Sequence, residues 1–89
     1  MLERIETELK IGQTVTLDGT DPNDGILDCP EINLWRDYHD RMAGVSATLK
    51  HGDKVTYLGE TEDNQGIHVK SGSVDGWVSW YFIQELKYE

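Results

Sequence analysis

Cys29 and His39 are the residues whose types could support covalent chemistry, because a thiolate nucleophile needs a nearby imidazole to take its proton. The sequence identifies no third group that would orient the imidazole, and a chain of 89 residues leaves little room for a closed pocket. Cys29 ends the short apolar run that begins at Ile26, which predicts a small buried strand residue. We therefore expect no catalytic residue and no enzyme activity.

Side chains that bind metals are present, but their spacing does not predict a metal site. His39, His51 and His68 show no ligand spacing with Cys29. The acidic turn at residues 21–25 has a superficial likeness to a calcium loop, yet it lacks the alternating carboxylates and the distant bidentate glutamate. The glycines are spaced as turn punctuation and form no phosphate loop. The sequence predicts no metal and no cofactor.

Residues 31–44 hold the densest group of aromatic and hydrogen-bonding side chains, which is typical of recognition surfaces. The leading interpretation is a ligand-binding loop in which Trp35, Tyr38 and His39 contact the ligand. A structural alternative is one helical turn that closes the fold and packs inward through the side chains of Leu34, Trp35, Tyr38 and Met42. A third interpretation is that this segment forms a patch through which the chain self-associates.

A second aromatic cluster, Trp80-Tyr81-Phe82, lies near the C-terminus. Neighbouring strand residues face opposite sides, so at least one of these rings is exposed, and Trp80 and Tyr81 join the candidate ligand-binding residues. Aromatic faces with an acidic rim suit an extended peptide that is basic or contains proline. The residues expected to form that rim are Glu31, Asp37 and Asp40.

The acidic composition excludes some partners. The formal net charge is -9, from 17 acidic and 8 basic side chains, and this sign opposes binding to nucleic acid or to an anionic membrane. A single cysteine cannot form an internal disulfide. The charged N-terminus does not resemble a signal peptide, and no apolar run is long enough to span a membrane. The chain is expected in the cytoplasm if it is full length, and outside the cell if it is an excised domain.

The elements that must position these residues are short strands. Alternation of Val45, Ala47 and Leu49, a turn at Gly52-Asp53, and renewed alternation from Val55 predict two strands with a bend. Further turns at residues 62–66 and 71–76 precede two more strand-like segments. Several short strands at near-regular spacing predict a small barrel or sandwich.

These segments resemble the bacterial SH3-like (SH3b) domain family. The resemblance is carried by Thr48–Glu60 and Asp75–Ile83, with Leu9–Leu17 similar to the opening strand and Gly25–Pro30 placed at the family's second strand. It covers roughly residues 9–86. It implies that residues 31–44 form the long early (RT-like) loop, that Trp77 packs in the core, and that both aromatic clusters share one groove. Wall-binding SH3b modules imply a cell-wall peptide as another ligand.

The sequence thus predicts an all-β fold, a small SH3-like barrel of about five to seven short strands with a 3-10 turn near the C-terminus. Residues 1–8 are expected to be a flexible lead-in and residues 9–87 a single domain. The expected function is non-catalytic recognition of a peptide or protein partner through an aromatic surface groove. The alternatives are a module that binds cell-wall (peptidoglycan) peptide in an exported protein, and a structural protein that self-associates.

Overall fold

The chain folds into short strands joined by turns. The computed structural model describes residues 4–5, 7–21 and 23–87, and within them it has no α-helix. The six strands are β1 (Thr14–Thr16), β2 (Glu31–Trp35), β3 (Val45–Lys50), β4 (Lys54–Glu60), β5 (Gly66–Ser71) and β6 (Val74–Ser79). The three 3-10 helices are η1 (Arg41–Ala43), η2 (Trp80–Phe82) and η3 (Gln84–Leu86). The predictions of an all-β fold and of 3-10 structure near the C-terminus are confirmed.

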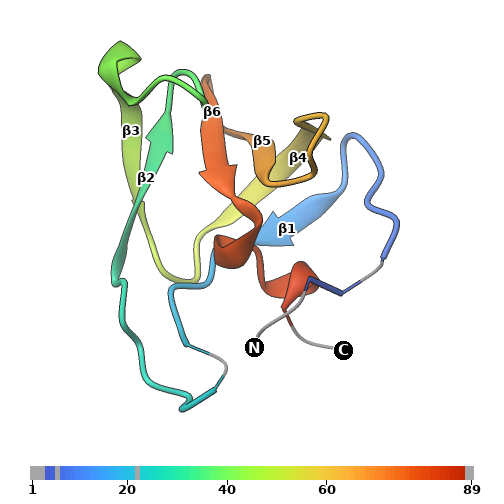
Figure 1. The fold of residues 1–89 in the computed structure, drawn as a ribbon, viewed down its shortest axis with the longest axis vertical. Coiled ribbons are helices and arrows are strands. Elements are labelled where there is room, and N and C mark those ends of the chain that lie inside the picture. Colours follow the sequence, from blue (N-terminus) through green and yellow to red (C-terminus); the bar gives the residue numbers. More distant parts are fainter. Residues whose placement is uncertain (1–3, 6, 22, 88–89) are drawn as a thin grey trace.

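All six strands belong to one antiparallel sheet in the order β1-β4-β5-β6-β2-β3 (Figure 1). β3 lies at one edge and β4 lies next to the other edge, yet the two strands follow each other in the chain. Only residues 51–53 separate them, so the sheet must curl until its two ends approach each other. A bridge between Leu17 and Ile83 extends the β1 edge. The architecture is compatible with a small SH3-like barrel.

The barrel interior is filled by alternate residues of the strands. In β4, for example, Val55 and Tyr57 are buried while Lys54 is exposed. The buried apolar residues form one cluster: Val15, Leu17, Ile32, Leu34, Val55, Tyr57, Ile67, Val69, Val78, Ile83 and Leu86. Each fully buried aliphatic side chain contributes about 1.5–3 kcal/mol to stability, so this cluster is the main source of folding free energy.

The second strand lies later in the sequence than predicted. Residues 25–30 form no strand and make one isolated β-bridge, between Leu27 and Thr20. The prediction of a strand there is wrong. β2 begins at Glu31 and takes the first five positions of the segment that was expected to be the RT-like loop. The long early loop is instead the segment between β1 and β2, which the structure describes at residues 18–21 and 23–30.

A helical turn, the structural alternative for residues 31–44, is present as η1, but the inward packing that this alternative required is not found. Leu34 is fully buried in β2 and does not belong to the turn. Met42, in the middle of η1, is 95% exposed. The turn therefore does not pack inward through an apolar face.

Two further expectations about burial are wrong. Trp77 is half-buried on the outer face, because its neighbours Gly76 and Val78 point into the barrel. Gly76 lies so close to the adjacent strand that a Cβ atom there would come 2.7 Å from Cβ of Leu34. Cys29 is half-buried and lies outside the strands.

The C-terminal segment anchors both the early loop and the start of the chain. The Lys87 ammonium donates hydrogen bonds to the carbonyl oxygens of Asp18, at 2.9 Å, and Thr20, at 2.7 Å. Burial lowers the pKa of Lys87, and the Asp18 carboxylate opposes that shift. In the predicted lead-in, residues 1–3 and 6 lie outside the described residues, whereas the Ile5 N–H donates to the Leu86 carbonyl oxygen at 3.0 Å.

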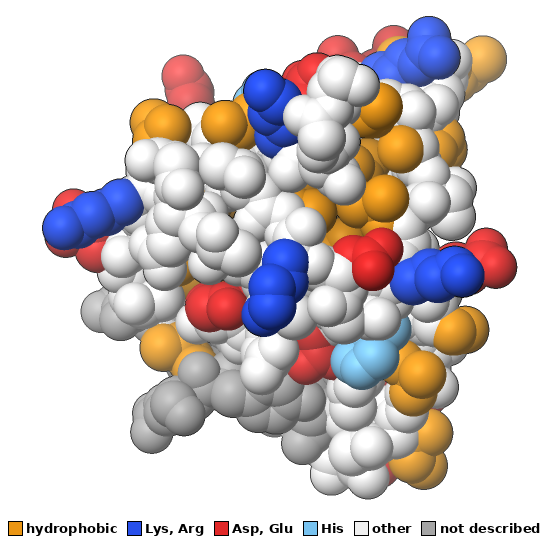
Figure 2. All heavy atoms as spheres, turned by 180° about the vertical axis from the view of Figure 1, so that it is seen from behind, with side chains coloured by type: hydrophobic (Ala, Val, Ile, Leu, Met, Phe, Trp, Pro, Cys, Tyr) orange, Lys and Arg blue, Asp and Glu red, His pale blue; other side chains and the backbone are white. Residues whose placement is uncertain are grey.

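The face opposite to that of Figure 1 carries charges of both signs around a strip of hydrophobic side chains (Figure 2). The acidic excess of the chain is therefore not spread as a field of one sign over this face. Among the described residues, no helix has the length and apolar character needed to cross a bilayer.

Candidate functional site

A groove of about 690 Å³ lies between two loops that are distant in sequence. Residues 36–39, which follow β2, form one wall, and residues 60–63, at the end of β4 and in the next turn, form the other. Trp77 of β6 completes the lining. The groove therefore combines aromatic rings with several acidic side chains.

The first wall is a loop held by its own side chains. The Asp37 carboxylate accepts the backbone N–H of His39, and the Asp40 carboxylate accepts the N–H of Met42, each at 3.0 Å. Gly44 ends the η1 turn at φ +90°, a left-handed conformation that favours glycine. Short aspartate caps of this kind fix the backbone locally, and each uses one carboxylate oxygen.

Tyr38 ties this loop to the start of β5. A Cβ atom on Gly66 would lie 2.6 Å from Cγ of Tyr38 and 2.9 Å from Cγ2 of Thr61. The phenol ring therefore lies directly over a glycine backbone, in a place that a larger residue would fill. His39 packs edge-on against the same ring, with 5.3 Å between ring centroids.

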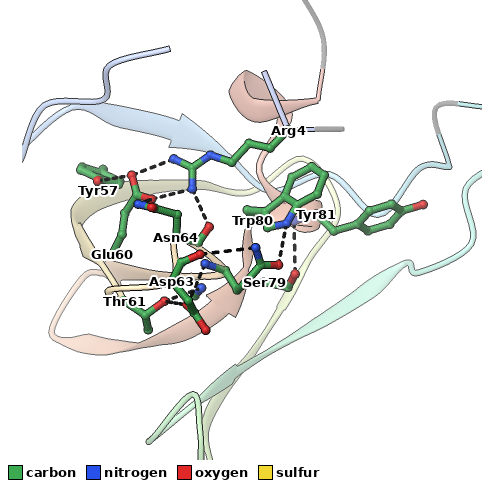
Figure 3. Close-up of polar contacts among 11 residues, drawn as sticks. Arg4, Tyr57, Glu60, Thr61, Asp63, Asn64, Ser79, Trp80 and Tyr81 are labelled. Carbon is green, nitrogen blue, oxygen red and sulfur yellow. Dashed lines mark hydrogen bonds and ion pairs between the residues drawn. The ribbon is translucent and has the colours of Figure 1, made fainter. Parts of the chain in front are cut away.

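The second wall is a turn with a dense hydrogen-bond network (Figure 3). The Asp63 carboxylate accepts the hydroxyl of Thr61 at 2.5 Å and the N–H of Gln65 at 3.0 Å. These bonds, the Thr61 hydroxyl first, lower the pKa of Asp63, and the nearby His39 contributes to the lowering. Asn64 adopts φ +61° to close the turn. Asp63 is therefore an anion in a fixed position on the groove wall.

Glu60 lies at the base of this turn and is already fully engaged (Figure 3). Arg4 donates two bonds to its carboxylate, at 2.5 and 2.8 Å, and the Tyr57 hydroxyl donates a third at 2.7 Å. The Arg4 bonds, with those of Tyr57 and Asn64, lower the pKa of Glu60 to about 2. Burial and the Glu60 carboxylate raise the pKa of Tyr57 to about 12. Glu60 is thus structural, and the carboxylates left to meet a ligand are those of Asp37, Glu62 and Asp63.

A second groove, also about 690 Å³, meets the first at Glu60. Its described lining consists of Arg4, Ile5, Thr7, Glu8, Leu9, Glu60 and Asn64. That lining holds no aromatic ring, so we take the first groove as the candidate site.

One cross-strand row of residues runs beneath the groove on the outer face of the barrel. Trp77 is paired with Trp35 of β2 on one side and with His68 of β5 on the other. The row continues to Val45 of β3 and to Gly59 of β4. Five strands therefore contribute one residue each to a line that passes through both tryptophans.

Each tryptophan in this row has a planar nitrogen-bearing side chain lying over its ring. The His68 and Trp77 rings are parallel within 10°, with 4.6 Å between centroids, and His68 Nε2 lies 2.7 Å from an Asp75 carboxylate oxygen. The guanidinium carbon of Arg41 lies 4.3 Å from the centre of the Trp35 ring. Both indole faces therefore accept planar groups that can carry positive charge.

The five predicted ligand-binding residues fall into three places. Tyr38 and His39 line the groove, and Trp35 lies beside its floor as the strand neighbour of Trp77. Trp80 packs against the core and donates its indole N–H to the Gln65 side chain at 3.2 Å. Tyr81 contacts Trp80 and the Lys87 ammonium, which lies 4.7 Å from its ring centre.

Tyr38 and Trp80 contact adjacent residues of the chain. Tyr38 packs on Gly66, and the Trp80 indole N–H donates to the side chain of Gln65. Trp35, Trp80 and Tyr81 nevertheless lie outside the groove lining. The site also includes residues that sequence reasoning did not assign to it, namely Trp77, Glu60, Thr61, Glu62 and Asp63. The signal that could have identified the last two is a pair of acidic residues at the tip of a predicted turn.

Other clusters do not add to the site. Carboxylate oxygens of Asp21, Asp24 and Asp28 lie within 4.8 Å of one another, and Asp21 and Asp24 each cap a backbone N–H two residues on. These caps are what the predicted turn requires. His39 faces Asp63 in the groove, whereas the Cys29 carbonyl packs against Gly19, so the two residues have different surroundings.

Comparison of the chain with protein-family models, with curated proteins and with solved structures finds no match. The groove is open and is lined by the rings of Tyr38, His39 and Trp77, by three available carboxylates and by one arginine. Such a groove can bind a cationic, partly apolar ligand.

Proposed function

We propose that this protein is a non-catalytic binding module that recognises a basic segment of a peptide or protein partner in the groove of Tyr38 and Trp77. The observation that carries the proposal is the gathering of Asp37, Glu62 and Asp63 around these two rings. Carboxylates attract lysine and arginine side chains, and aromatic faces bind both their cations and their alkyl stems.

An extended peptide is the ligand shape that an open groove accepts. Its walls are two turns fixed by side-chain caps, so little ordering is needed when the partner binds, and a preorganised site loses less free energy on association. The resemblance to the SH3b family is part of this proposal, and the all-β barrel with its single curled sheet supports it.

Titration with three blocked peptides of equal length, one basic, one neutral and one acidic, tests the proposal by calorimetry. The basic peptide should bind and the acidic one should not. The double variant Asp37→Asn/Glu62→Gln should weaken binding of the basic peptide by about tenfold or more, because it removes two of the three available carboxylates.

A matched control separates local contact from overall charge. The double variant Asp24→Asn/Glu31→Gln removes the same charge at exposed positions outside the groove. It should weaken binding by about twofold or less, since solvent and salt screen distant charges. Equal weakening by both double variants would show that the chain attracts cations without using this groove.

A further inference from the structure

The contact between Arg41 and Trp35 places an internal cation on a surface that is continuous with the groove. The guanidinium carbon lies 4.3 Å from the centre of the half-buried Trp35 ring. At this distance the contact is a cation–π interaction, which is weak at an exposed position. A contact of this strength can be exchanged for a similar one.

The position of Arg41 in the chain allows its side chain to move off the Trp35 ring. It belongs to η1, a turn of three residues none of which is buried, and its neighbour Met42 is 95% exposed. The turn is held at its ends by the Asp40 cap and by Gly44. Rotation of the Arg41 side chain away from the indole therefore disturbs no core contact.

Trp35 lies within reach of a ligand in the groove. It is the direct strand partner of Trp77, and neighbouring strands lie about 4.8 Å apart. Asp37, which follows two residues later, lines the groove and keeps one carboxylate oxygen beyond its own cap. A peptide side chain that leaves the groove over Trp77 therefore meets the Trp35 face next.

The indole faces of Trp35 and Trp77 favour arginine over lysine. A guanidinium is planar and weakly hydrated, so it stacks on an aromatic face more readily than the compact ammonium of lysine does. The chain itself uses planar groups on both indoles, Arg41 on Trp35 and His68 on Trp77.

We infer that the Trp35 face is an arginine subsite, which Arg41 fills in the free protein and which an arginine of the bound partner takes over. This inference rests on the proposed function and adds to it the identity of one ligand side chain. Arg41 is then an internal competitor. Because a partner must displace it from the Trp35 ring, the apparent affinity of the protein for arginine-containing partners is lower than it would be without Arg41.

The test compares two blocked peptides that differ only in carrying arginine or lysine at the basic positions. Arg41→Ala should tighten binding of the arginine peptide by about 3- to 5-fold and that of the lysine peptide by less, since only the guanidinium gains the vacated face. Lys54→Ala is the control, because it removes the same charge from β4, where the side chain bonds to Thr16. It should change both affinities by about twofold or less.

The subsite itself is tested by replacing the ring. In a Trp35→Leu background, or in Trp35→Ile if the first variant is unstable, Arg41→Ala should no longer discriminate between the two peptides. If Arg41→Ala has the same effect as Lys54→Ala in the native background, the inference is overturned.

The proposed function and the inference can fail separately. If Asp37→Asn/Glu62→Gln weakens binding as expected but Arg41→Ala does not favour the arginine peptide, the groove stands and the arginine subsite falls. If Arg41→Ala favours the arginine peptide while the carboxylate variant has no more effect than its control, the Trp35 subsite stands and the role proposed for the Asp37 and Glu62 carboxylates falls.

Discussion

Trp77 and His68 lie face to face on the outside of the barrel, on adjacent strands and in direct register. Val78, which follows Trp77 in β6, points into the core and is 1% exposed. The tryptophan is thus a surface platform, although it is the largest side chain in its strand. This arrangement separates residues that form the core, such as Val78, from residues on the outer face, such as Trp77.

Trp77→Ala should destabilise the protein by about 1–2 kcal/mol, because it removes a stacked and half-buried ring without opening a core cavity. It should also weaken binding of the basic peptide by about tenfold or more, as expected for an aromatic hot spot. Urea titration and calorimetry provide the two measurements.

The control for this prediction is Val78→Ala, which creates a cavity and should cost about 2–3 kcal/mol while leaving the affinity of the folded protein unchanged. A larger loss of stability for Trp77→Ala than for Val78→Ala would place the tryptophan among the core residues after all.

The Glu60 network predicts a pH-dependent contribution to stability. The pKa of Glu60 falls from 4.5 to about 2 in the folded protein, so the stabilisation is complete above pH 4.5 and is lost as the pH falls towards 2. Glu60→Gln should therefore lower the free energy of unfolding at pH 7 by about 1–3 kcal/mol, the usual range for charged hydrogen bonds. At pH 2 the variant and the native protein should have nearly equal stability.

Glu62→Gln serves as the control, since Glu62 is exposed on the same turn. Its stability should follow that of the native protein at every pH. A constant difference between Glu60→Gln and the native protein from pH 7 to pH 2 would contradict the role assigned to Arg4.

Gly19→Ala should destabilise the protein by about 3 kcal/mol or more, because its Cβ atom would lie 1.8 Å from the Cys29 carbonyl oxygen. Backbone must move to relieve such a contact, and the early loop is held there by N–H groups of Asp28 and Cys29 that donate to the Gly19 carbonyl oxygen.

Cys29→Ala tests whether the side chain or the backbone of Cys29 matters at this contact. It removes only a half-buried sulfur atom and should cost about 1 kcal/mol or less. Thermal unfolding of the two variants gives the comparison, and similar melting temperatures would refute the backbone contact.

Association of the basic peptide with the groove should slow as salt concentration rises, because screening at about 0.1 M salt limits electrostatic steering to about 10 Å. Stopped-flow fluorescence of the tryptophans measures the rate. The dependence on salt should be shallower in Asp37→Asn/Glu62→Gln than in Asp24→Asn/Glu31→Gln. Identical slopes would assign the steering to the whole chain.

Much of the fold could be predicted from local pattern. The alternation in β3 and β4 and the turn between them are visible in the sequence because side chains of period two must face one interior. The early loop was not predictable in this way. Ile26 and Leu27 look like a strand, but both are exposed, and the segment is held by long-range bonds such as that from the His51 N–H to the Pro30 carbonyl oxygen.

The candidate site was predictable in part. Aromatic density identified Tyr38 and His39, which do line the groove. Trp77 was assigned to the core because a large ring in a strand is expected to be buried, whereas close approach to the neighbouring strand turns the small Gly76 inward instead. The second wall depends on contacts between distant segments, such as Arg4 with Glu60, that no local pattern contains.

The order of the strands has a consequence for synthesis of the chain. β1 is paired with β4, Leu17 bridges to Ile83, and the carbonyl groups of residues 18 and 20 are bound by Lys87. As a ribosome extends the chain from its N-terminus, these early segments have no native partner until the second half has been made. The barrel therefore closes only when its last turn is free to fold back, and the nascent chain carries an unpaired β1 segment until then.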